Sequence, residues 1–380
     1  MKHFDYIFLG SGLASLMTVY ELILSKKYTN KSILLLDHDL KKTNDRTWCF
    51  WDNEALFETI ISKKWDKAFF ANQNFSRTLD FSPYRYKMIQ GLDFYNMVFE
   101  LISEQNNIHF VNQKVIDFQD LNDKCIVKTQ TETFSCHKVF NSIYNSVWVE
   151  NQTRFPLLQQ HFMGWFIKTD KAVFSENTAT FMDFSVEQRG NTRFMYVLPT
   201  SSTEALIEYT LFSADLLAYD EYETEIKNYI QNLGITHFEI LDKEQGNIPM
   251  TSFEFWKNNT KNTINIGSAG GWTKASTGFT FKNTTKKAKA LAAFLNSEND
   301  FRKFHKRDKF WWYDLLFIDV LFKNNALGSS VFSSLFQNGN PALILKFLDG
   351  ETTFFQDLKV MLKCPTLPFV KALWGRIFKL

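Results

Sequence analysis

The sequence has few of the features that mark secreted, metal-binding and membrane-spanning proteins. Its 380 residues include only four cysteines, Cys49, Cys125, Cys136 and Cys364, and no two of them form a Cys-x-x-Cys pair. No histidine spacing suggests zinc, so we expect no metal site and reduced thiols in a cytoplasmic setting. The N-terminus leads directly into an apolar strand pattern, so we expect no signal peptide. No run reaches about 18 uncharged apolar residues, so we expect no spanning helix.

An excess of charge of one sign is also missing, while aromatic residues are abundant. The net charge is +2, which does not favour nucleic acid as a partner. Residues 301–380 hold 12 Lys or Arg against 6 Asp or Glu. This basic segment favours an anionic membrane surface, although a solvated basic face is an equally good interpretation. Aromatic residues make up 17% of the chain, with 40 Phe and 10 Trp, which indicates a large aromatic cavity or an apolar surface.

Residues 5–37 have the pattern of a dinucleotide-binding βαβ unit. Two short apolar runs, 5–9 and 32–36, flank a segment at 13–24 that is apolar on nearly every face and is typical of a buried helix. Asp37 ends the second run and can accept a hydrogen bond from a ribose hydroxyl. The alternative is an ordinary buried βαβ unit with a glycine turn.

The loop of this unit runs through Gly10, Ser11, Gly12, Leu13 and Ala14. Gly10 permits the tight turn, and Gly12 lets the main chain approach a pyrophosphate, whose charge the helix N-terminus attracts. The usual third glycine is replaced by Ser15. Serine is small enough for close packing of helix on strand, so we interpret it as a tolerated departure.

A second glycine loop, late in the chain, favours FAD over NAD. Residues 262–266 form an apolar strand pattern, and Gly267, Gly270 and Gly271 follow it before a helix predicted at 283–295. FAD is long and extended, and its flavin end requires a close main-chain approach of its own. We therefore expect these three glycines to border the flavin.

The rest of the pattern predicts an α/β fold, α+β overall. A Rossmann-like FAD-binding domain comprises residues 1–150 and 250–298, including a helix at 93–106 and a parallel strand at 108–111. A substrate domain at 151–249, joined by part of 45–90, has a mostly antiparallel sheet with strands near 162–167, 179–184, 192–198 and 205–212. Residues 299–380 form a helical region. Its aromatic helix at 310–322 and basic helix at 369–380 are candidates for a membrane-facing surface, and a helix that caps the core is nearly as good an interpretation of the second.

Glu208 stands inside an apolar strand pattern and is the first candidate for a catalytic group. Leu206, Thr210 and Phe212 share its strand face. If that face points inward, desolvation favours the protonated carboxyl, which is a general acid. A half-exposed strand glutamate is the alternative.

The chain resembles the bacterial lycopene β-cyclases of the FAD-binding carotenoid cyclase family over essentially its whole length. The segments that carry the resemblance are 5–12, Asn44-Asp-Arg-Thr-Trp-Cys-Phe-Trp51, 160–165, 181–184, 207–210, 267–271 and 276–281. Ser15 is one departure. Tyr209 is another, because the motif often has a second acid there, and this puts in doubt any mechanism that needs two adjacent carboxylates.

The resemblance implies an enzyme that cyclises the ends of lycopene to β-ionone rings, giving γ-carotene and β-carotene. The reaction is acid-initiated and involves no net redox change. It also implies FAD in its reduced form, maintained by NAD(P)H, and peripheral association with the membrane that holds the carotene. In this interpretation Glu208 is the proton donor and Arg46 reaches a phosphate, although a salt bridge from Arg46 to Asp45 is an equal alternative. Asp183 is a second polar group or proton acceptor, or else a turn residue at a strand end, and His161 is structural. The aromatic side chains assigned to the substrate are Trp48, Phe50, Trp51, Trp165 and Phe279.

Two other functions fit the same sequence. An FAD-dependent reductase or hydroxylase of isoprenoid lipids would share the fold but consume NAD(P)H stoichiometrically. A non-catalytic carotenoid-binding protein would hold pigment unchanged and would not depend on Glu208.

Overall fold

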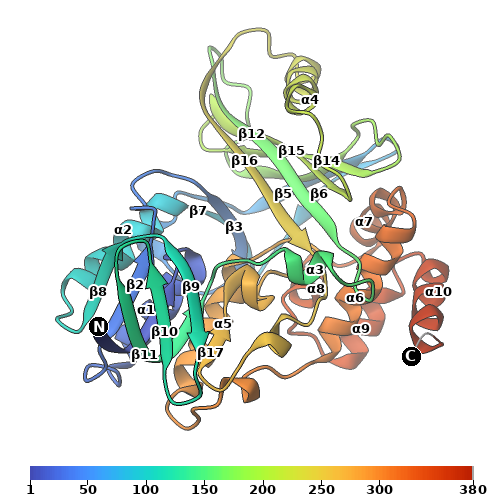
Figure 1. Cartoon of the computed structure of the whole chain (residues 1–380). Coiled ribbons are helices and arrows are strands. Elements are labelled where there is room, and N and C mark those ends of the chain that lie inside the picture. Colours follow the sequence, from blue (N-terminus) through green and yellow to red (C-terminus); the bar gives the residue numbers. More distant parts are fainter. Residues whose placement is uncertain (379–380) are drawn as a thin grey trace.

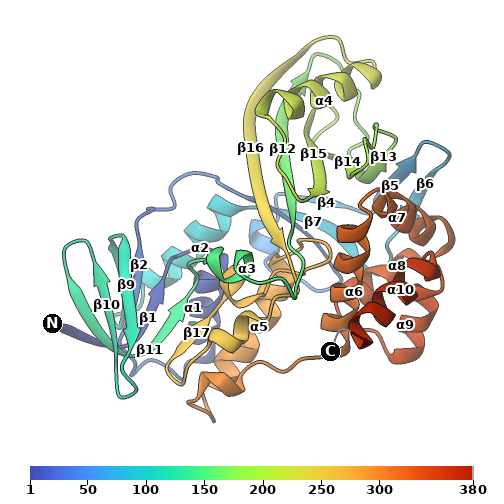
Figure 2. The same ribbon diagram turned by 45° about the vertical axis from the view of Figure 1, so that its right-hand side comes forward.

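A computed structural model describes residues 1–378 of the chain. Its main parts are a parallel sheet with helices, a large antiparallel sheet above it, and a bundle of helices at the C-terminal end (Figures 1 and 2). The α/β fold class is therefore confirmed.

The first sheet contains the predicted dinucleotide-binding unit, with strands β1 (Lys2–Leu9) and β2 (Ile33–Asp37) joined by α1 (Leu13–Ser25). β8 (Ile108–Asn112) lies parallel to β2, as expected, and follows α2 (Gly91–Ser103). β11 (Thr133–Asn141) lies parallel to β1 on its other side. The sheet is extended by the antiparallel strands β9 (Val115–Asp120) and β10 (Cys125–Thr129).

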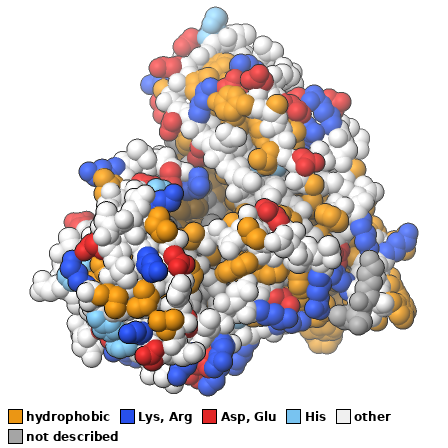
Figure 3. All heavy atoms as spheres, viewed as in Figure 1, with side chains coloured by type: hydrophobic (Ala, Val, Ile, Leu, Met, Phe, Trp, Pro, Cys, Tyr) orange, Lys and Arg blue, Asp and Glu red, His pale blue; other side chains and the backbone are white. Residues whose placement is uncertain are grey.

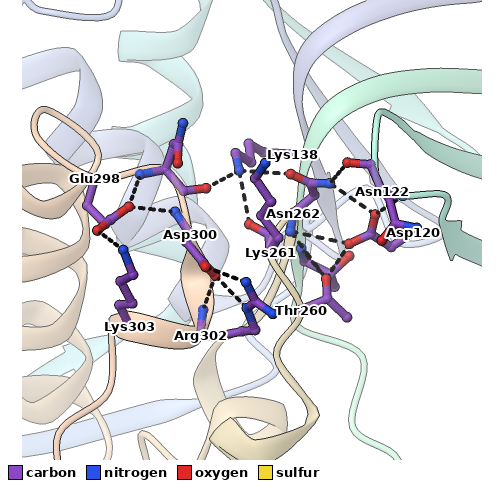
Figure 4. A network of polar contacts seen from close by, with 12 residues as sticks. Asp120, Asn122, Lys138, Thr260, Lys261, Asn262, Glu298, Asp300, Arg302 and Lys303 are labelled. Atoms are coloured by element: carbon purple, nitrogen blue, oxygen red, sulfur yellow. Dashed lines mark hydrogen bonds and ion pairs between the residues drawn. The ribbon is translucent and has the colours of Figure 1, made fainter.

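The chain returns to this sheet after a long excursion. β17 (Thr263–Asn265) pairs with the last residues of β11, and α5 (Phe281–Phe294) then packs against α1. A polar network fixes the return (Figure 4). Lys138 donates to the carbonyl of Lys261 and to the Asn262 side chain, both at 3.0 Å, and Asn262 donates to Asp120 at 3.0 Å. Residues 260–262 are thus tied to both β9 and β11.

The second large sheet has the strand order β16–β12–β15–β14–β13–β5–β6 and is antiparallel except for β13 and β5, which pair in parallel. The four predicted strands correspond to β12 (Leu158–Thr169), β13 (Thr178–Phe184), β14 (Thr192–Pro199) and β15 (Glu204–Ser213). The hairpin β5 (Lys67–Asn72) and β6 (Ser76–Asp80) joins beside β13, and α4 (Tyr219–Asn232) covers one face. The sequence pattern did not predict β16 (Phe238–Met250), a long strand at the edge that pairs with β12.

A small third sheet lies between the two large ones. It consists of β3 (Thr47–Asp52), β7 (Arg85–Gln90) and β4 (Lys63–Trp65). The aromatic motif at 48–51 therefore lies on a strand, and its rings are buried. A short helix, α3 (Val147–Glu150), precedes β12.

The C-terminal helices are α6 (Lys309–Lys323), α7 (Leu327–Asn338), α8 (Pro341–Leu348), α9 (Phe354–Met361) and α10 (Thr366–Ile377). Arg376 on α10 pairs with Asp319 on α6 at 2.6 Å, and Asp314 accepts from Lys274 at 2.7 Å. α6 packs against α7 and α10, and most of its side chains are half-buried or buried. The docking role of 310–322 stays a prediction. The end of the predicted helix 369–380 lies outside the described residues. Within residues 1–378, no helix is long and apolar enough to cross a bilayer.

Candidate active site

A cavity of about 450 Å³ lies where the three sheets meet. Its walls come from the N-terminal ends of α1 and α5, from β3, and from the inner face of β12, β15 and β16. Figure 3 shows the surface hollowed between the upper part of the molecule and the dinucleotide-binding part. Both predicted glycine loops border this space through Gly12 and Gly267.

The first glycine loop is shaped as the motif requires. Gly10 has a φ of +88°, and a Cβ there would stand 2.4 Å from the Ser142 hydroxyl. A Cβ on Gly12 would meet nothing within 4 Å, so its main chain is open to a ligand. Gly12 caps α1 without a side-chain hydrogen bond, and no acidic residue lies in the first turn. The free N–H groups of α1, near Leu13 and Ala14, are thus available to an anion.

Asp37 lies at the end of β2, beside this loop rather than in the cavity wall. One oxygen, Oδ2, accepts hydrogen bonds from the main-chain N–H of Ser11 at 2.7 Å and from its hydroxyl at 2.8 Å. Asp37 therefore fixes the glycine loop. Ser15 is fully buried at the position of the third glycine, and its hydroxyl has no partner among the described residues.

The second glycine loop forms part of the cavity wall through Gly267. Gly267 has a φ of +61° and its Cβ would stand 2.9 Å from that of Ala14, so the two glycine loops are in contact. Gly270 and Gly271 lie behind the wall, where a Cβ on Gly270 would overlap the carbonyl of Asn265 at 2.1 Å. These two glycines shape the loop without lining the cavity.

Several polar groups of the wall are buried without a partner in the described part of the protein. They are the hydroxyls of Thr277 and Thr284 and the side-chain carbonyl of Gln160. Buried polar atoms are rarely left unpaired, so they indicate a bound group with hydrogen-bonding edges. The N-terminus of α5, next to Thr284, adds free main-chain N–H groups. The residues present therefore fit an extended, partly anionic cofactor such as FAD.

Arg46 lines the cavity and is exposed to it. The alternative of a salt bridge to Asp45 is not what the contacts give. Arg46 donates to the main-chain carbonyl of Asp45 at 2.8 Å, whereas the Asp45 carboxylate accepts from the hydroxyl of Tyr95 at 2.8 Å. The rest of the guanidinium is thus available to a phosphate.

Glu208 points into the cavity from β15, on the face shared with Leu206 and Thr210. Its Oε1 accepts a hydrogen bond from the Thr210 hydroxyl at 2.6 Å. Tyr196 of β14 lies directly opposite it in the sheet, and Gly164 of β12 lies on the other side. The side chain is half-buried, and the surface that remains exposed lines the cavity.

A second carboxyl, Glu244 of β16, was missed by the sequence analysis. It lies across β12 from Glu208, because both residues pair with Gly164. The two carboxyl groups are neighbours in the cavity wall, close enough to share a hydrogen bond, and Thr47 donates to Glu244 Oε2 at 2.7 Å. Its strand is polar and exposed at most positions from 239 to 247, a pattern that is typical of an edge strand and equally of a loop.

The environment favours a proton on this pair. Burial raises the pKa of Glu208, and the negative charge of Glu244 raises it further. Burial also raises the pKa of Glu244, but less, because hydrogen bonds from Thr47 and Glu208 and the charge of Arg46 lower it. The nearby tyrosines Tyr86 and Tyr196 stay neutral, since burial raises the pKa of each hydroxyl.

The predicted aromatic residues divide between the cavity and its surroundings. Trp48 and Phe279 line the cavity, and Phe50 and Trp51 pack immediately behind them. Trp165 is not part of this group, because it is buried on the opposite face of β12 against α4. Its place in the wall is taken by Phe162, Tyr86 and Tyr196, which the sequence analysis did not assign.

Asp183 and His161 also lie away from the cavity, beneath α4. Asp183 accepts hydrogen bonds from the Tyr229 hydroxyl and from the main-chain N–H of Ser185, both at 2.8 Å. It is thus a strand-end turn residue, and the assignment as a second catalytic group does not fit. His161 contacts Ser213 at 2.6 Å and Tyr222 at 2.5 Å, and burial lowers its pKa to about 4, which agrees with a structural role.

The fold is the one found in flavin-dependent enzymes. It is similar to a flavoprotein/dehydrogenase from Cytophaga hutchinsonii, with a TM-score of 0.65, 14% identity and coverage of 99% of this chain and 100% of that one. It is also similar to a geranylgeranyl bacteriochlorophyll reductase-like protein from Thermoplasma acidophilum, with a TM-score of 0.62, 12% identity and 99% coverage of both chains. The flavin-dependent brominase Bmp2 gives a TM-score of 0.64 at 13% identity over 100% of both chains.

The sequence identifies the family within this class of flavoproteins. The model of the family described as lycopene cyclase protein matches residues 5–374. The chain therefore belongs to the lycopene cyclase family. No curated protein sequence matches it.

Proposed function

We propose that this protein is a lycopene β-cyclase of carotenoid biosynthesis. It converts the open ends of lycopene to β-ionone rings, through γ-carotene to β-carotene, in an acid-initiated isomerisation without net redox change. The observation that carries the proposal is the carboxyl pair Glu208–Glu244, whose burial raises the pKa of both groups, set in an aromatic cavity that two flavin-type glycine loops border.

FAD would be held by the α1 loop, by Arg46 and by the loop at Gly267. When bound in its reduced, anionic form, maintained by NAD(P)H, it supplies negative charge that stabilises a nearby carbocation. The N-terminus of α5, at Thr280 and Phe281, suits such an anionic ring because its free N–H groups carry the positive end of the helix dipole.

The protein side chains supply the acid and the enclosure. Glu208 is the proton donor to the terminal double bond. Tyr86, Tyr196, Phe162 and Phe279 surround the position where positive charge develops, and the faces of their rings stabilise a cation. The same rings exclude water, which would otherwise trap the cation as an alcohol.

The first test is expression in a bacterium that accumulates lycopene. The wild-type protein should convert the pigment to β-carotene, and Glu208→Gln should lower the conversion by about 100-fold or more, the usual contribution of a general acid. Glu204→Gln is the matched control, because Glu204 lies on the same strand and only pairs with Lys168 near the surface. Pigment that remains lycopene with wild-type protein would reject the proposal.

A second assay separates cyclisation from the related activities. Purified protein loaded with FAD is reduced once, without further NAD(P)H, and given lycopene in detergent. Several ring closures per flavin are expected from a cyclase. A reductase or hydroxylase would stop after one equivalent, and a carotenoid-binding protein would return the pigment unchanged.

The surface of α9 and α10 fits an anionic membrane. The exposed apolar side chains there are Phe354, Phe355, Leu358, Leu362, Leu367, Val370, Leu373, Trp374, Ile377 and Phe378. Exposed Lys359, Lys363 and Lys371 lie among them and complement anionic lipid headgroups. Figure 3 shows hydrophobic and basic side chains together at its lower right, around the C-terminal helices.

A second cavity, of about 250 Å³ and almost entirely apolar, lies beneath this surface. It borders α9 and α10 at Met361 and Val370, and it reaches Thr277, which also lines the flavin cavity. We propose that this cavity guides a carotene chain from the bilayer toward the glutamates. In this proposal the protein works on the cytoplasmic side of the membrane, to which it binds peripherally.

Vesicle sedimentation tests the docking surface. The protein should bind phosphatidylglycerol vesicles and bind phosphatidylcholine vesicles more weakly. The triple variant Phe355→Asp/Leu362→Asp/Trp374→Asp should lose binding, because its side chains are exposed and their replacement leaves the core intact. The control carries the same change at the exposed Ile116, Leu121 and Val173, far from α9 and α10 in the fold, and should bind as the wild type does. Equal loss of binding in both would refute the assignment.

A further inference from the structure

Glu244 lies beside the proposed proton donor, and the neighbouring strand fixes its position. It lies on the edge strand β16 and reaches the cavity beside Glu208. Gly164 leaves room for the two side chains to approach each other, because a Cβ at this position would stand 3.3 Å from Glu244 Cγ and 3.4 Å from Glu208 Cβ. A side chain at 164 would force the two carboxyl groups apart.

The contacts around the pair favour a shared proton. An ionised carboxylate is only an acceptor, so two carboxyl groups bond each other only when one of them is protonated. One oxygen of each group already accepts from a hydroxyl, Thr210 on Glu208 and Thr47 on Glu244. The remaining oxygens are left for the shared proton and for the substrate.

The surrounding charges divide the pair into an acid and a base. Arg46, next to Thr47 in the chain, and Lys41 are the cations of the described cavity wall, and the charge of Arg46 favours the ionised form of Glu244. Asp242 acts weakly in the opposite direction. Around Glu208 lie Cys49, Tyr86 and Tyr196, all of which burial keeps neutral. These surroundings favour the shared proton on Glu208 and the negative charge on Glu244.

We propose that Glu244 is the base that removes the proton which ends the cyclisation, so that the two glutamates pass one proton through a closed cycle. The inference rests on the proposed function. Glu208 gives its proton to the less substituted carbon of the terminal double bond, its O–H bond breaks, and a tertiary cation forms at the other carbon of that double bond. The next double bond closes the six-membered ring with its electron pair and moves the cation into the ring. The Glu244 carboxylate takes the proton from the adjacent ring carbon, and the electrons of that C–H bond become the ring double bond.

The cycle closes within the protein. The proton on Glu244 returns to Glu208 through the hydrogen bond that joins them, so atoms and electrons balance without an external acid, base or oxidant. The position of the base also decides the product, because the β-ring arises only when the proton leaves the ring carbon at the junction with the polyene. Loss from another ring carbon or from the methyl group gives isomeric rings.

The test is Glu244→Gln, which keeps the size and hydrogen bonding of the side chain but cannot accept a proton. Formation of β-rings should fall about 100-fold. The residual products should contain ring isomers and alcohols from trapping by water, and lowering the pH should not restore β-rings. Glu239→Gln is the matched control, since Glu239 is exposed on the same strand. FAD absorption and melting temperature report that the variants are folded.

The result with Glu244→Gln distinguishes a base from a residue that only raises the pKa of Glu208. If Glu244 only raised the pKa of Glu208, the variant would regain normal β-carotene formation at lower pH, and that result overturns the inference. Retention of more than half the wild-type rate with β-rings as the sole product also overturns it. If the wild-type protein itself forms no ring, the proposed function fails before this comparison begins.

Discussion

Replacing Gly164 by alanine should separate the activity of this protein from its stability. The new methyl group would stand 2.7 Å from Leu206 Cδ1 and within 3.4 Å of both glutamate side chains. Leu206 can rotate away, because the atom in question is the end of a flexible side chain. Glu208 and Glu244 meet the methyl through Cβ and Cγ, so each must shift by a few tenths of an ångström in opposite directions.

The expected magnitudes follow from this geometry. Overpacking in a well-packed region costs about 1–3 kcal/mol, and the loss of glycine freedom in the unfolded chain offsets about 0.4–1 kcal/mol. The free energy of unfolding should therefore fall by between about 0 and about 2.6 kcal/mol. Cyclisation should fall further, by roughly 10- to 100-fold, because displacement of a catalytic pair by a fraction of an ångström disturbs both proton transfers.

The assay is pigment analysis in lycopene-accumulating cells together with melting temperature and FAD absorption of the purified variant. Gly375→Ala is the control, since the nearest atom to its methyl is Lys323 Nζ at 3.5 Å and alanine is the better helix former. A Gly164→Ala protein that binds FAD and cyclises at more than half the wild-type rate would refute the role of this glycine.

Two further predictions concern protonation and the covered face of the sheet. Because burial raises the pKa of Glu208 and Glu244, the folded protein binds more protons than the unfolded chain above the ordinary carboxyl pKa of about 4.3. Cyclisation should thus persist at neutral pH and decline at alkaline pH. The unfolding free energy should fall as the pH rises from about 5 to about 8, and a melting series should show a smaller fall in Glu208→Gln/Glu244→Gln. Asp183→Asn should keep most of the cyclase activity and lower the melting temperature, because the carboxylate accepts hydrogen bonds from Tyr229 and Ser185. A loss of activity in a variant of unchanged melting temperature would instead support a catalytic role for Asp183.

Local sequence patterns were sufficient for the dinucleotide unit and for Glu208. Two glycines, an apolar helix and an acid at the end of a strand specify their geometry over a short stretch of chain. The alternation around Glu208 correctly placed Leu206, Thr210 and Phe212 on one face. In each case the information lies within about one element, so no distant contact is needed to interpret it.

The faces of the substrate sheet could not be assigned in the same way. Alternation tells which residues share a face, but it does not tell which face a distant helix covers. Here α4, inserted between β15 and β16, covers the face that carries His161, Trp165 and Asp183. These residues are buried because α4 packs over them. Trp165 and Asp183 were nevertheless predicted to face the substrate.

Glu244 escaped prediction for a different reason. Its strand β16 is exposed at most positions from Glu239 to Asn247, because it lies at the edge of the sheet, and such a polar segment is typical of a loop as well as of an edge strand. Pairing with β12 is what brings residue 244 to the level of residue 208, thirty-six positions earlier in the chain. This register is a long-range property.

The departure at Tyr209 takes on a definite meaning in this structure. Neighbouring residues of a strand point to opposite faces, so an acid at 209 would point toward α4, where the Tyr209 hydroxyl accepts a hydrogen bond from Arg193 at 3.1 Å. It could not share a cavity with Glu208. A second carboxyl reaches Glu208 only from a neighbouring strand on the same face, and only across a residue without a side chain. Glu244 and Gly164 meet both conditions, so the doubt that Tyr209 raised about a two-carboxylate mechanism does not apply to this chain.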